Sequence, residues 1–353
     1  MQLDYIIIGQ GICGTFLSWN LLKEGKSVFV IDSANPYTAS KAASGVINPV
    51  TGRRIVRTWM IEELLPVAWD AYTQIGNDLN VSLIQQCNVL DFHPTPQMHD
   101  AFMQRMNEEK VYLHAASNEE QWQQYFRYNY GIGEINSCLL IDLQMMLGEW
   151  RKKLMQQNIL LEENFDCRQL TIDELQNTVH YKNITAQKII FCDGVAGFDN
   201  PYFKMLPYVR TKGEALIASI PGLPRTNIFK QGITIVPWQQ DFFWIGSNYI
   251  WEYTDVQPTA LFRKKVEEQL NYWLKLSYTI IEHIASERPS NIERRPFVGL
   301  HPLYKQVGVL NGMGTKGCSL APYFAHQLTK HLVNHKPVDQ LADVKRFTRI
   351  LSM

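Results

Sequence analysis

The chain has 353 residues, 46% of them hydrophobic and 19% charged, which is enough apolar material for two domains or one elaborated domain. Its 34 basic residues balance its 34 acidic residues, so the charge argues against nucleic acid or an anionic membrane surface as a partner. The six cysteines form no Cys-x-x-Cys pair, and no apolar run reaches the roughly 18 to 20 residues that span a bilayer. With no leader before the first apolar run, these features predict a cytoplasmic protein without a bound metal or a membrane span.

The first 32 residues have the pattern of a dinucleotide-binding unit. The apolar run 4–8 predicts a strand buried in a parallel sheet, and residues 12–24 predict a helix that Gly25 ends. A second apolar run, 28–32, closes on Asp32, which can accept hydrogen bonds from a ribose. Three glycines between the first strand and the helix permit a tight turn, the approach of a pyrophosphate, and close packing of helix on strand. They are Gly9, Gly11 and Gly14.

The residues that follow predict alternating helices and strands. The small-residue stretch 39–46 suits a backbone that lies against a flat cofactor. Helices are predicted at 58–79, 97–109, 142–158 and 258–276. Strands are predicted at 81–93, 159–161, 164–170, 178–182 and 188–192, and several more between 209 and 249, including a hairpin of 232–237 with 242–246. Residues 110–140 have no clear pattern.

A second Gly-x-Gly-x-x-Gly motif lies near the C-terminus. It follows a predicted strand at 307–310 and precedes a predicted helix at 319–334. Too little sequence follows Gly317 for another strand ending in an acid, so we predict no second nucleotide. The helix start is expected instead to face an electron-rich ring of the first cofactor.

The chain resembles the FAD-dependent D-amino-acid oxidase superfamily, and the glycine oxidases within it most closely. The matching residues are the N-terminal glycine motif, Ser44-Gly45-Val46, Lys212-Gly213-Glu214, Ile235-Val236-Pro237, Gly246, Glu287-Arg288-Pro289, residues 295–302 and Gly317-Cys318-Ser319-Leu320-Ala321-Pro322. The resemblance implies an α/β fold in which a Rossmann-like FAD-binding domain is interleaved with a mixed-sheet α+β substrate domain. The FAD domain would comprise 1–55, 140–205 and 286–353, and the substrate domain 56–139 and 206–285.

The resemblance also implies a non-covalent FAD and the residues that contact it. Besides the three N-terminal glycines, these would be Ile12 and Cys13 at the pyrophosphate, Asp32 and Ser33 at the adenosine ribose, and Ser40, Ser44, Gly45 and Val46 on the flavin side. Gly194 follows the strand at 188–192 and is expected to contact FAD too. The pyrimidine end of the flavin would meet Gly312, Met313, Gly314, Thr315, Lys316, Gly317 and Cys318.

The substrate residues are implied in the same way. The family's carboxylate-binding arginine maps to Arg288, with Arg294 and Arg295 as rival positions. The other expected substrate contacts depart from the glycine oxidase pattern. Thr234 stands where a tyrosine often faces the substrate, and Thr315, with Lys316 beside it, stands where those enzymes carry a second arginine.

The sequence therefore predicts an FAD-dependent amine or amino-acid oxidase or dehydrogenase. It would oxidise the C–N bond of a small amino acid or secondary amine bearing a carboxylate, by hydride transfer to flavin N5, and pass electrons to O2 or another acceptor. Three alternatives stay open: a flavin dehydrogenase of 2-hydroxy acids, a catalytically silent flavoprotein, and a tRNA-modifying flavin oxidase. The last is kept open by a local basic patch, Arg53, Arg54 and Arg57. An oligomer is possible, and the substrate's identity is left open.

Overall fold

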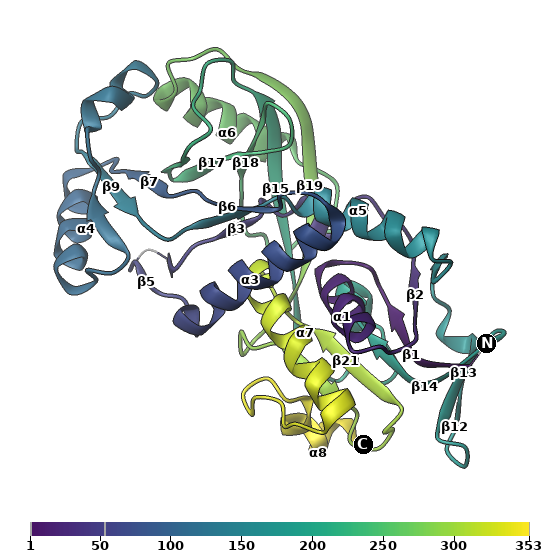
Figure 1. Ribbon diagram of the computed structural model, residues 1–353. Coiled ribbons are helices and arrows are strands. Elements are labelled where there is room, and N and C mark those ends of the chain that lie inside the picture. The colour runs from purple at the N-terminus through teal and green to yellow at the C-terminus, as the bar shows by residue number, and fades with distance from the viewer. Residues whose placement is uncertain (1, 53, 353) are drawn as a thin grey trace.

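The computed structural model describes residues 2–52 and 54–352, so Arg53 of the basic patch lies outside the described residues. Two eight-stranded sheets form the framework. Figure 1 shows the first, around β1 and β14, beside helices α1 and α7, and the second, around β17 and β18, beneath α6. The long strands β15 and β19 run from the second sheet towards the first.

The helices are α1 (Ile12–Lys23), α2 (Ala39–Ala42), α3 (Ile61–Leu79), α4 (Pro96–Glu108), α5 (Leu143–Gln156), α6 (Ala260–Trp273), α7 (Gly317–Asn334) and α8 (Thr348–Leu351). Short 3₁₀ helices are η1 (Glu119–Gln124), η2 (Cys167–Gln169), η3 (Gly194–Phe198) and η4 (Val344–Phe347). None of the helices in the described part of the chain is both long and apolar enough to cross a bilayer.

The first sheet has a parallel core. Its strands lie in the order β11 (Leu160–Glu162), β2 (Val28–Asp32), β1 (Gln2–Ile8), β14 (Ile184–Phe191), β13 (Thr178–Tyr181) and β12 (Leu170–Asp173), and β21 (Val307–Asn311) joins β14 to β20 (Phe297–Leu300). Strands β11, β2, β1, β14 and β21 are mutually parallel neighbours. Ile7 packs with α1 and α7 on one face, while Ile6 and Ile8 pack into a separate cluster on the other. Burial on both faces explains why β1 is apolar without alternation.

The second sheet is mixed. Its order is β19 (Thr279–Asn291), β15 (Tyr208–Ser219), β18 (Phe242–Gly246), β17 (Ile233–Pro237), β16 (Ile228–Gln231), β7 (Val89–Phe92), β9 (Ile132–Ile135) and β8 (Leu113–Ala115). Only the β16–β7 pair is parallel. There are also two small sheets among the described residues. One consists of β3 (Val46–Ile47), β10 (Leu139–Ile141) and β6 (Ile84–Gln86), and the other of β4 (Val50–Thr51) and β5 (Val56–Arg57). In the sequence, their strands fall between strands of the first large sheet and strands of the second.

The predicted α/β class, a Rossmann-like sheet with a mixed-sheet partner, is confirmed. The strands of the first sheet come from three separated stretches of sequence, as an interleaved division requires. The division at 55, 139, 205 and 285 stays a proposal, and β19 itself crosses the last of these positions.

Several predicted elements need correction. The strand expected at 164–170 is instead η2 followed by β12, because Asp166 caps a 3₁₀ turn through the Arg168 N–H. The strand expected at 81–93 is two strands, β6 and β7, which belong to different sheets. Helix α3 begins at Ile61 rather than at 58, because Met60 has a left-handed backbone. Strand β19 was not predicted at all, although it carries Arg288.

Candidate functional site

One cavity of about 770 Å³ is lined by both glycine motifs, by the end of β2 and by Arg288. The predicted residues that line it are Gly9, Gly11, Ile12, Cys13, Asp32, Ser33, Ser40, Ser44, Gly194, Arg288, Met313, Gly314, Thr315, Gly317 and Cys318. Segments more than 250 residues apart thus meet around a single space, as the resemblance implied.

The first glycine motif holds its turn through contacts that no side chain could make. Gly9 has a φ of +94°, and a Cβ on it would lie 2.5 Å from the carbonyl oxygen of Cys192. A Cβ on Gly14 would lie 1.8 Å from the Gly9 carbonyl oxygen. The N-terminus of α1 is therefore pressed against the carboxyl ends of β1 and β14, and it opens into the cavity, where the Ile12 N–H donates to Ser40 Oγ at 3.0 Å.

Asp32 is held as a hydrogen-bond acceptor at the end of β2. Its Oδ2 accepts from the Gln10 N–H at 2.8 Å, and its Oδ1 accepts from the Ala34 N–H at 2.9 Å and from Arg151 at 2.7 Å. Burial opposes ionisation, but these hydrogen bonds and the Arg151 charge lower the pKa of Asp32 below its ordinary value. Arg151, which the sequence analysis did not single out, lies on α5 and also pairs with Glu162 at 2.8 Å.

The second glycine motif forms the loop between β21 and α7. The Gly314 N–H donates to the Pro289 carbonyl at 3.0 Å, which joins this loop to the strand that carries Arg288. Burial raises the pKa of the Cys318 thiol to about 12, which disfavours a thiolate at this helix start.

Six predicted residues do not line the cavity. Gly14, Gly45, Val46 and Gly312 are within two residues of lining residues in the chain, and Gly45 and Gly312 have φ values of +82° and +77°. The Lys316 side chain is directed towards Thr58, whose Oγ1 lies 3.0 Å from Nζ. Thr234 pairs with Gly246 across β17 and β18. The structure therefore does not bring Thr234 and Lys316 together with Arg288 in this cavity.

Arg288 presents its guanidinium to the cavity from the edge strand β19. Its Nη2 donates to Ser247 Oγ at 3.0 Å, its Nη1 donates to the Asn248 carbonyl at 3.2 Å, and the Tyr249 ring lies 4.7 Å from its Cζ. Gly213 makes room for it, since a Cβ there would lie 1.8 Å from Nη2. Burial lowers the pKa of Arg288, yet guanidinium stays charged in proteins. No carboxylate among the described residues pairs with it.

The contacts to Arg288 come from a segment that we call the strap, residues 247–259, between β18 and α6. No pattern in the sequence predicted it. Glu214, which is 1% exposed, anchors the strap's far end by accepting from the Thr259 N–H at 2.6 Å and from Thr259 Oγ1. At the near end the Asn248 side chain accepts from the Glu214 N–H at 2.7 Å. The strap is thus fixed at both ends by one buried carboxylate residue.

Asp193 is a further cavity residue that the sequence analysis did not predict as part of the site. It follows β14, and its carboxylate accepts from Asn200 and Asn311 side chains, each at 2.9 Å. Burial raises the pKa of Asp193 to about 6 despite these hydrogen bonds.

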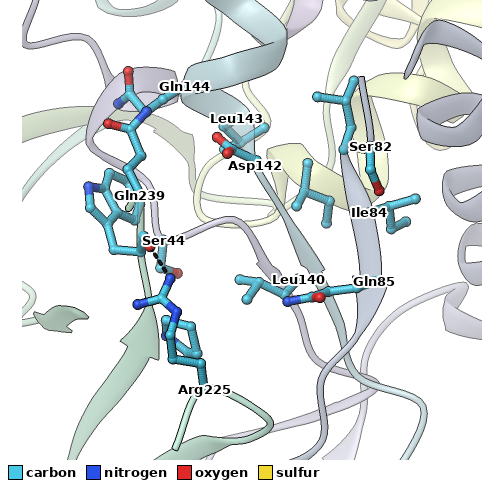
Figure 2. Close-up of a pocket in the computed structure, with 14 residues that line it drawn as sticks. Ser44, Ser82, Ile84, Gln85, Leu140, Asp142, Leu143, Gln144, Arg225 and Gln239 are labelled. Atoms are coloured by element: carbon cyan, nitrogen blue, oxygen red, sulfur yellow. Dashed lines mark hydrogen bonds between the residues drawn. The ribbon is translucent and has the colours of Figure 1, made fainter. Parts of the chain in front are cut away.

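A smaller pocket of about 420 Å³ adjoins the cavity, because Ser44 and Leu143 line both. Figure 2 shows it between Arg225 and Gln239 on one side and Gln85 on the other. Arg225 donates to the carbonyls of Trp238 and Phe242 and so braces the β17–β18 hairpin. Polar and apolar residues line this pocket in similar measure, and it belongs to the surroundings of the main cavity.

The sequence profile described as FAD dependent oxidoreductase matches residues 4–331. The chain belongs to this family. Its cofactor is FAD, and the non-covalent attachment that is typical of the family was predicted from the sequence. A curated relative, the uncharacterised oxidoreductase YurR of Bacillus subtilis, is 40% identical over 56 residues, which is 16% of this chain and 15% of that protein.

Solved structures with the same fold include three enzymes. Glycine oxidase from Bacillus cereus superposes with a TM-score of 0.80 at 14% identity, covering 95% of this chain and 96% of that one. Iminodiacetate oxidase from Chelativorans sp. BNC1 gives 0.77 at 17% identity with the same coverage. L-proline dehydrogenase from P. horikoshii gives 0.72 at 15% identity, covering 99% and 98%. At these identities the likeness shows the fold.

The residues around the cavity fit FAD. Gly9, Gly11 and the α1 N-terminus would hold the diphosphate, and Asp32, an ionised acceptor, would hold the adenosine ribose. The backbone from Met313 to Cys318 would meet the flavin ring. The cavity volume of about 770 Å³ lies within the range of roughly 300 to 1,000 Å³ that is usual for ligand sites.

Proposed function

We propose that this FAD-dependent oxidoreductase oxidises the C–N bond of a small amino acid or secondary amine that bears a carboxylate. The observation that carries the proposal is Arg288, a guanidinium in the cofactor cavity with no carboxylate partner among the described residues. An uncompensated charge in such a place is costly unless a ligand supplies the opposite charge. A planar fork of N–H donors matches a carboxylate with two parallel hydrogen bonds.

The surroundings of Arg288 orient that fork. The Nη1 of Arg288 donates to the carbonyls of Asn248 and Lys212, its Nη2 donates to Ser247 Oγ, and the Tyr249 ring covers a face. Nε and the second N–H of Nη2 have no partner among the described residues and are available to a ligand. A substrate carboxylate bound there fixes the position of its α-carbon, which lowers the entropic part of the barrier.

The rest of the cavity wall is suited to excluding water. Trp244, which is 7% exposed, is held by its Nε1 donating to the Ala42 carbonyl at 3.0 Å, and Ala215 and Ile284 add apolar wall. Bound FAD would supply the acceptor for a hydride from the substrate carbon. No side-chain base is needed when the amine arrives neutral, and the imine product hydrolyses in water to an oxo acid and ammonia or an amine.

The proposal is tested by anaerobic titration of the FAD-loaded protein with amino acids, secondary amino acids and 2-hydroxy acids, recorded as loss of flavin absorbance. We expect Arg288→Ala to keep its FAD and to lose about 100-fold or more in kcat/KM for carboxylate substrates. Arg168→Ala, at an arginine whose side chain is 90% exposed and pairs with Asp166, is the control and should match wild type.

A second variant tests whether the position of the guanidinium matters, and not only its presence. Gly213→Ala keeps Arg288 but places a Cβ where Nη2 lies, so it should also weaken carboxylate substrates without releasing FAD. Unimpaired turnover in Arg288→Ala would refute the proposal. Reduction by hydroxy acids alone would reassign the site to a 2-hydroxy-acid dehydrogenase, and no reduction by any compound would favour a silent flavoprotein.

A further inference from the structure

We propose that Lys316, Arg294 and Arg295 form a binding site for an oxyanion, a phosphate or the acidic group of an organic acid, separate from the FAD cavity. None of the three lines that cavity. They come together because the turn after β19 packs against the loop before α7. The Asn291 side chain fastens the two by donating to the carbonyls of Arg295 and Gly312, at 2.7 and 2.9 Å.

The Lys316 ammonium is half-buried and has neutral partners. Its Nζ lies 3.0 Å from Thr58 Oγ1 and 3.5 Å from Thr51 Oγ1, both hydroxyls of the β4–β5 segment. Thr58 is itself 5% exposed, so its hydroxyl is a fixed acceptor. An ammonium has three donors, and two hydroxyls leave one donor and the whole charge uncompensated.

Arg295 is held in place by packing rather than by an acid. Its Cζ lies 4.0 Å from the centre of the Trp59 ring, and its Nη1 donates to the Arg294 carbonyl at 3.1 Å. Trp59 stacks on Phe324 of α7, with ring centres 6.1 Å apart and planes 14° apart. The guanidinium therefore has a rigid support and keeps most of its donors free.

Lys316 and Arg295 are brought close by the adjacent residues that they contact, Thr58 and Trp59, and the exposed Arg294 directly precedes Arg295 in the chain. No ion pair among the described residues involves any of the three. Other arginines nearby do have acidic partners: Arg346 pairs with Glu293 at 3.1 Å, and Arg57 pairs with Glu109 at 2.5 Å. Burial, followed by the charges of Arg294 and Arg295, lowers the pKa of Lys316 to about 8. Mutual repulsion of this kind is relieved when an anion binds between the cations.

Phosphate binding to the FAD-loaded protein tests the site, by calorimetry with inorganic phosphate at low ionic strength and with chloride at equal ionic strength as the baseline. We expect wild type to bind phosphate and Lys316→Gln to bind it about 10-fold more weakly. Lys330→Gln is the matched control, because Lys330 pairs with Glu24 at 2.6 Å and should bind as wild type does. Arg295→Gln should weaken phosphate as Lys316→Gln does.

A spectroscopic readout is independent of activity. When lysines are dimethylated with ¹³C, the Lys316 signal should titrate near pH 8 and move to higher pH on adding phosphate. Equal phosphate affinity in wild type and Lys316→Gln, or no difference between phosphate and chloride, would overturn the inference.

A further experiment asks whether the bound anion is a free ion or part of the substrate. It rests on the proposed function, because it uses amino acids as substrates. Anaerobic flavin reduction is compared for amino acids with one and with two acidic groups. If Lys316→Gln weakens the diacids alone, the anion is the distal group of the substrate. If it weakens neither, the site takes a free anion. Failure of every amino acid to reduce flavin would count against the proposed function, while the phosphate result would stand.

Discussion

At the scale of single residues, Gly14 is where the cofactor site depends most on a missing side chain. A Cβ there would lie 1.8 Å from the Gly9 carbonyl oxygen, which is backbone and cannot swing aside. Gly14→Ala should therefore lift α1 from β1, lower the bound FAD at least about 10-fold and destabilise the fold by roughly 2 kcal/mol.

The control for Gly14→Ala is Gly148→Ala on α5. Gly148 has no atom within 4 Å of an added Cβ, so alanine should leave FAD content unchanged and add up to about 1 kcal/mol of helix stability. FAD per protein and chemical denaturation measure both effects. A Gly14→Ala protein with full FAD content would show that α1 can move without cost.

Asp193 gives a pH dependence whose sign can be worked out. Its pKa is raised from 3.8 to about 6 by burial, so the folded state binds a proton more readily than the unfolded state does. Its contribution to stability is then greatest below about pH 4 and is lost as the pH rises through 6, by ~1–3 kcal/mol. Asp193→Asn lacks this loss, so its stability relative to wild type should rise between pH 4 and pH 7.

Urea unfolding at several pH values measures the difference between Asp193→Asn and wild type. Asp199→Asn, at a side chain that is 84% exposed, is the control and should show a constant difference from wild type. A constant difference for Asp193→Asn would mean that the buried carboxyl is not the titrating group.

At the scale of elements, the strap can be loosened through its anchor. Thr259 both caps α6, accepting from the Phe262 N–H at 3.3 Å, and donates to the buried Glu214. Thr259→Val should destabilise the protein by roughly 2–3 kcal/mol and raise KM for a carboxylate substrate roughly 3- to 10-fold, because Ser247 and Tyr249 then hold Arg288 less firmly.

Thr95→Val is a matched control for the strap, since Thr95 caps α4 through the Met98 N–H at 3.3 Å and touches no part of it. Thr95→Val should lower the free energy of unfolding by about 1 kcal/mol and leave KM unchanged. Thermal unfolding and steady-state kinetics distinguish the two variants. An unchanged KM in Thr259→Val would show that the strap does not position Arg288.

The elements also show what the sequence could predict. Sequence patterning placed α4, α5, α6 and α7 within a few residues, because local patterning determines a helix with one buried face. Helix α1 is buried nearly all round and was placed instead by the glycine motif before it and by Gly25 after it. Strand β19 was not predicted because Pro289 interrupts the sequence pattern of a strand. A proline is tolerated there since β19 is the edge of its sheet, a position that sequence alone does not reveal.

The site divides in a similar way. The glycine motif and Asp32 could be derived from spacing, because their chemistry is local to one strand–turn–helix unit. Arg288 came only through resemblance, and its partners Ser247 and Tyr249 could not be foreseen, since a 13-residue strand and the strap bring them together. The direction of Lys316 depends on a packing contact with Thr58, which no local pattern encodes.

At the scale of the whole molecule, bound FAD should stabilise two parts of the chain that are distant in sequence. The α1 start and the β21–α7 loop line one cavity and lie side by side, since a Cβ on Gly317 would lie 3.4 Å from Ile12, yet they are more than 250 residues apart in the chain. FAD that contacts both should slow hydrogen exchange of residues 9–15 and 312–318 together, at the same FAD concentration. At free FAD of 100 times Kd, the folded state gains about 2.7 kcal/mol.

The hairpin of β12 and β13 provides the internal control, since its residues do not line the cavity and Figure 1 shows it projecting from the first sheet. Its exchange should not change when FAD is added. A ligand slows hydrogen exchange only in the loops that it contacts. Protection of residues 9–15 without protection of residues 312–318 would therefore show that the second glycine motif does not contact FAD. It would also remove the reason for placing the flavin ring beside Arg288, whose strand is joined to that motif through Pro289.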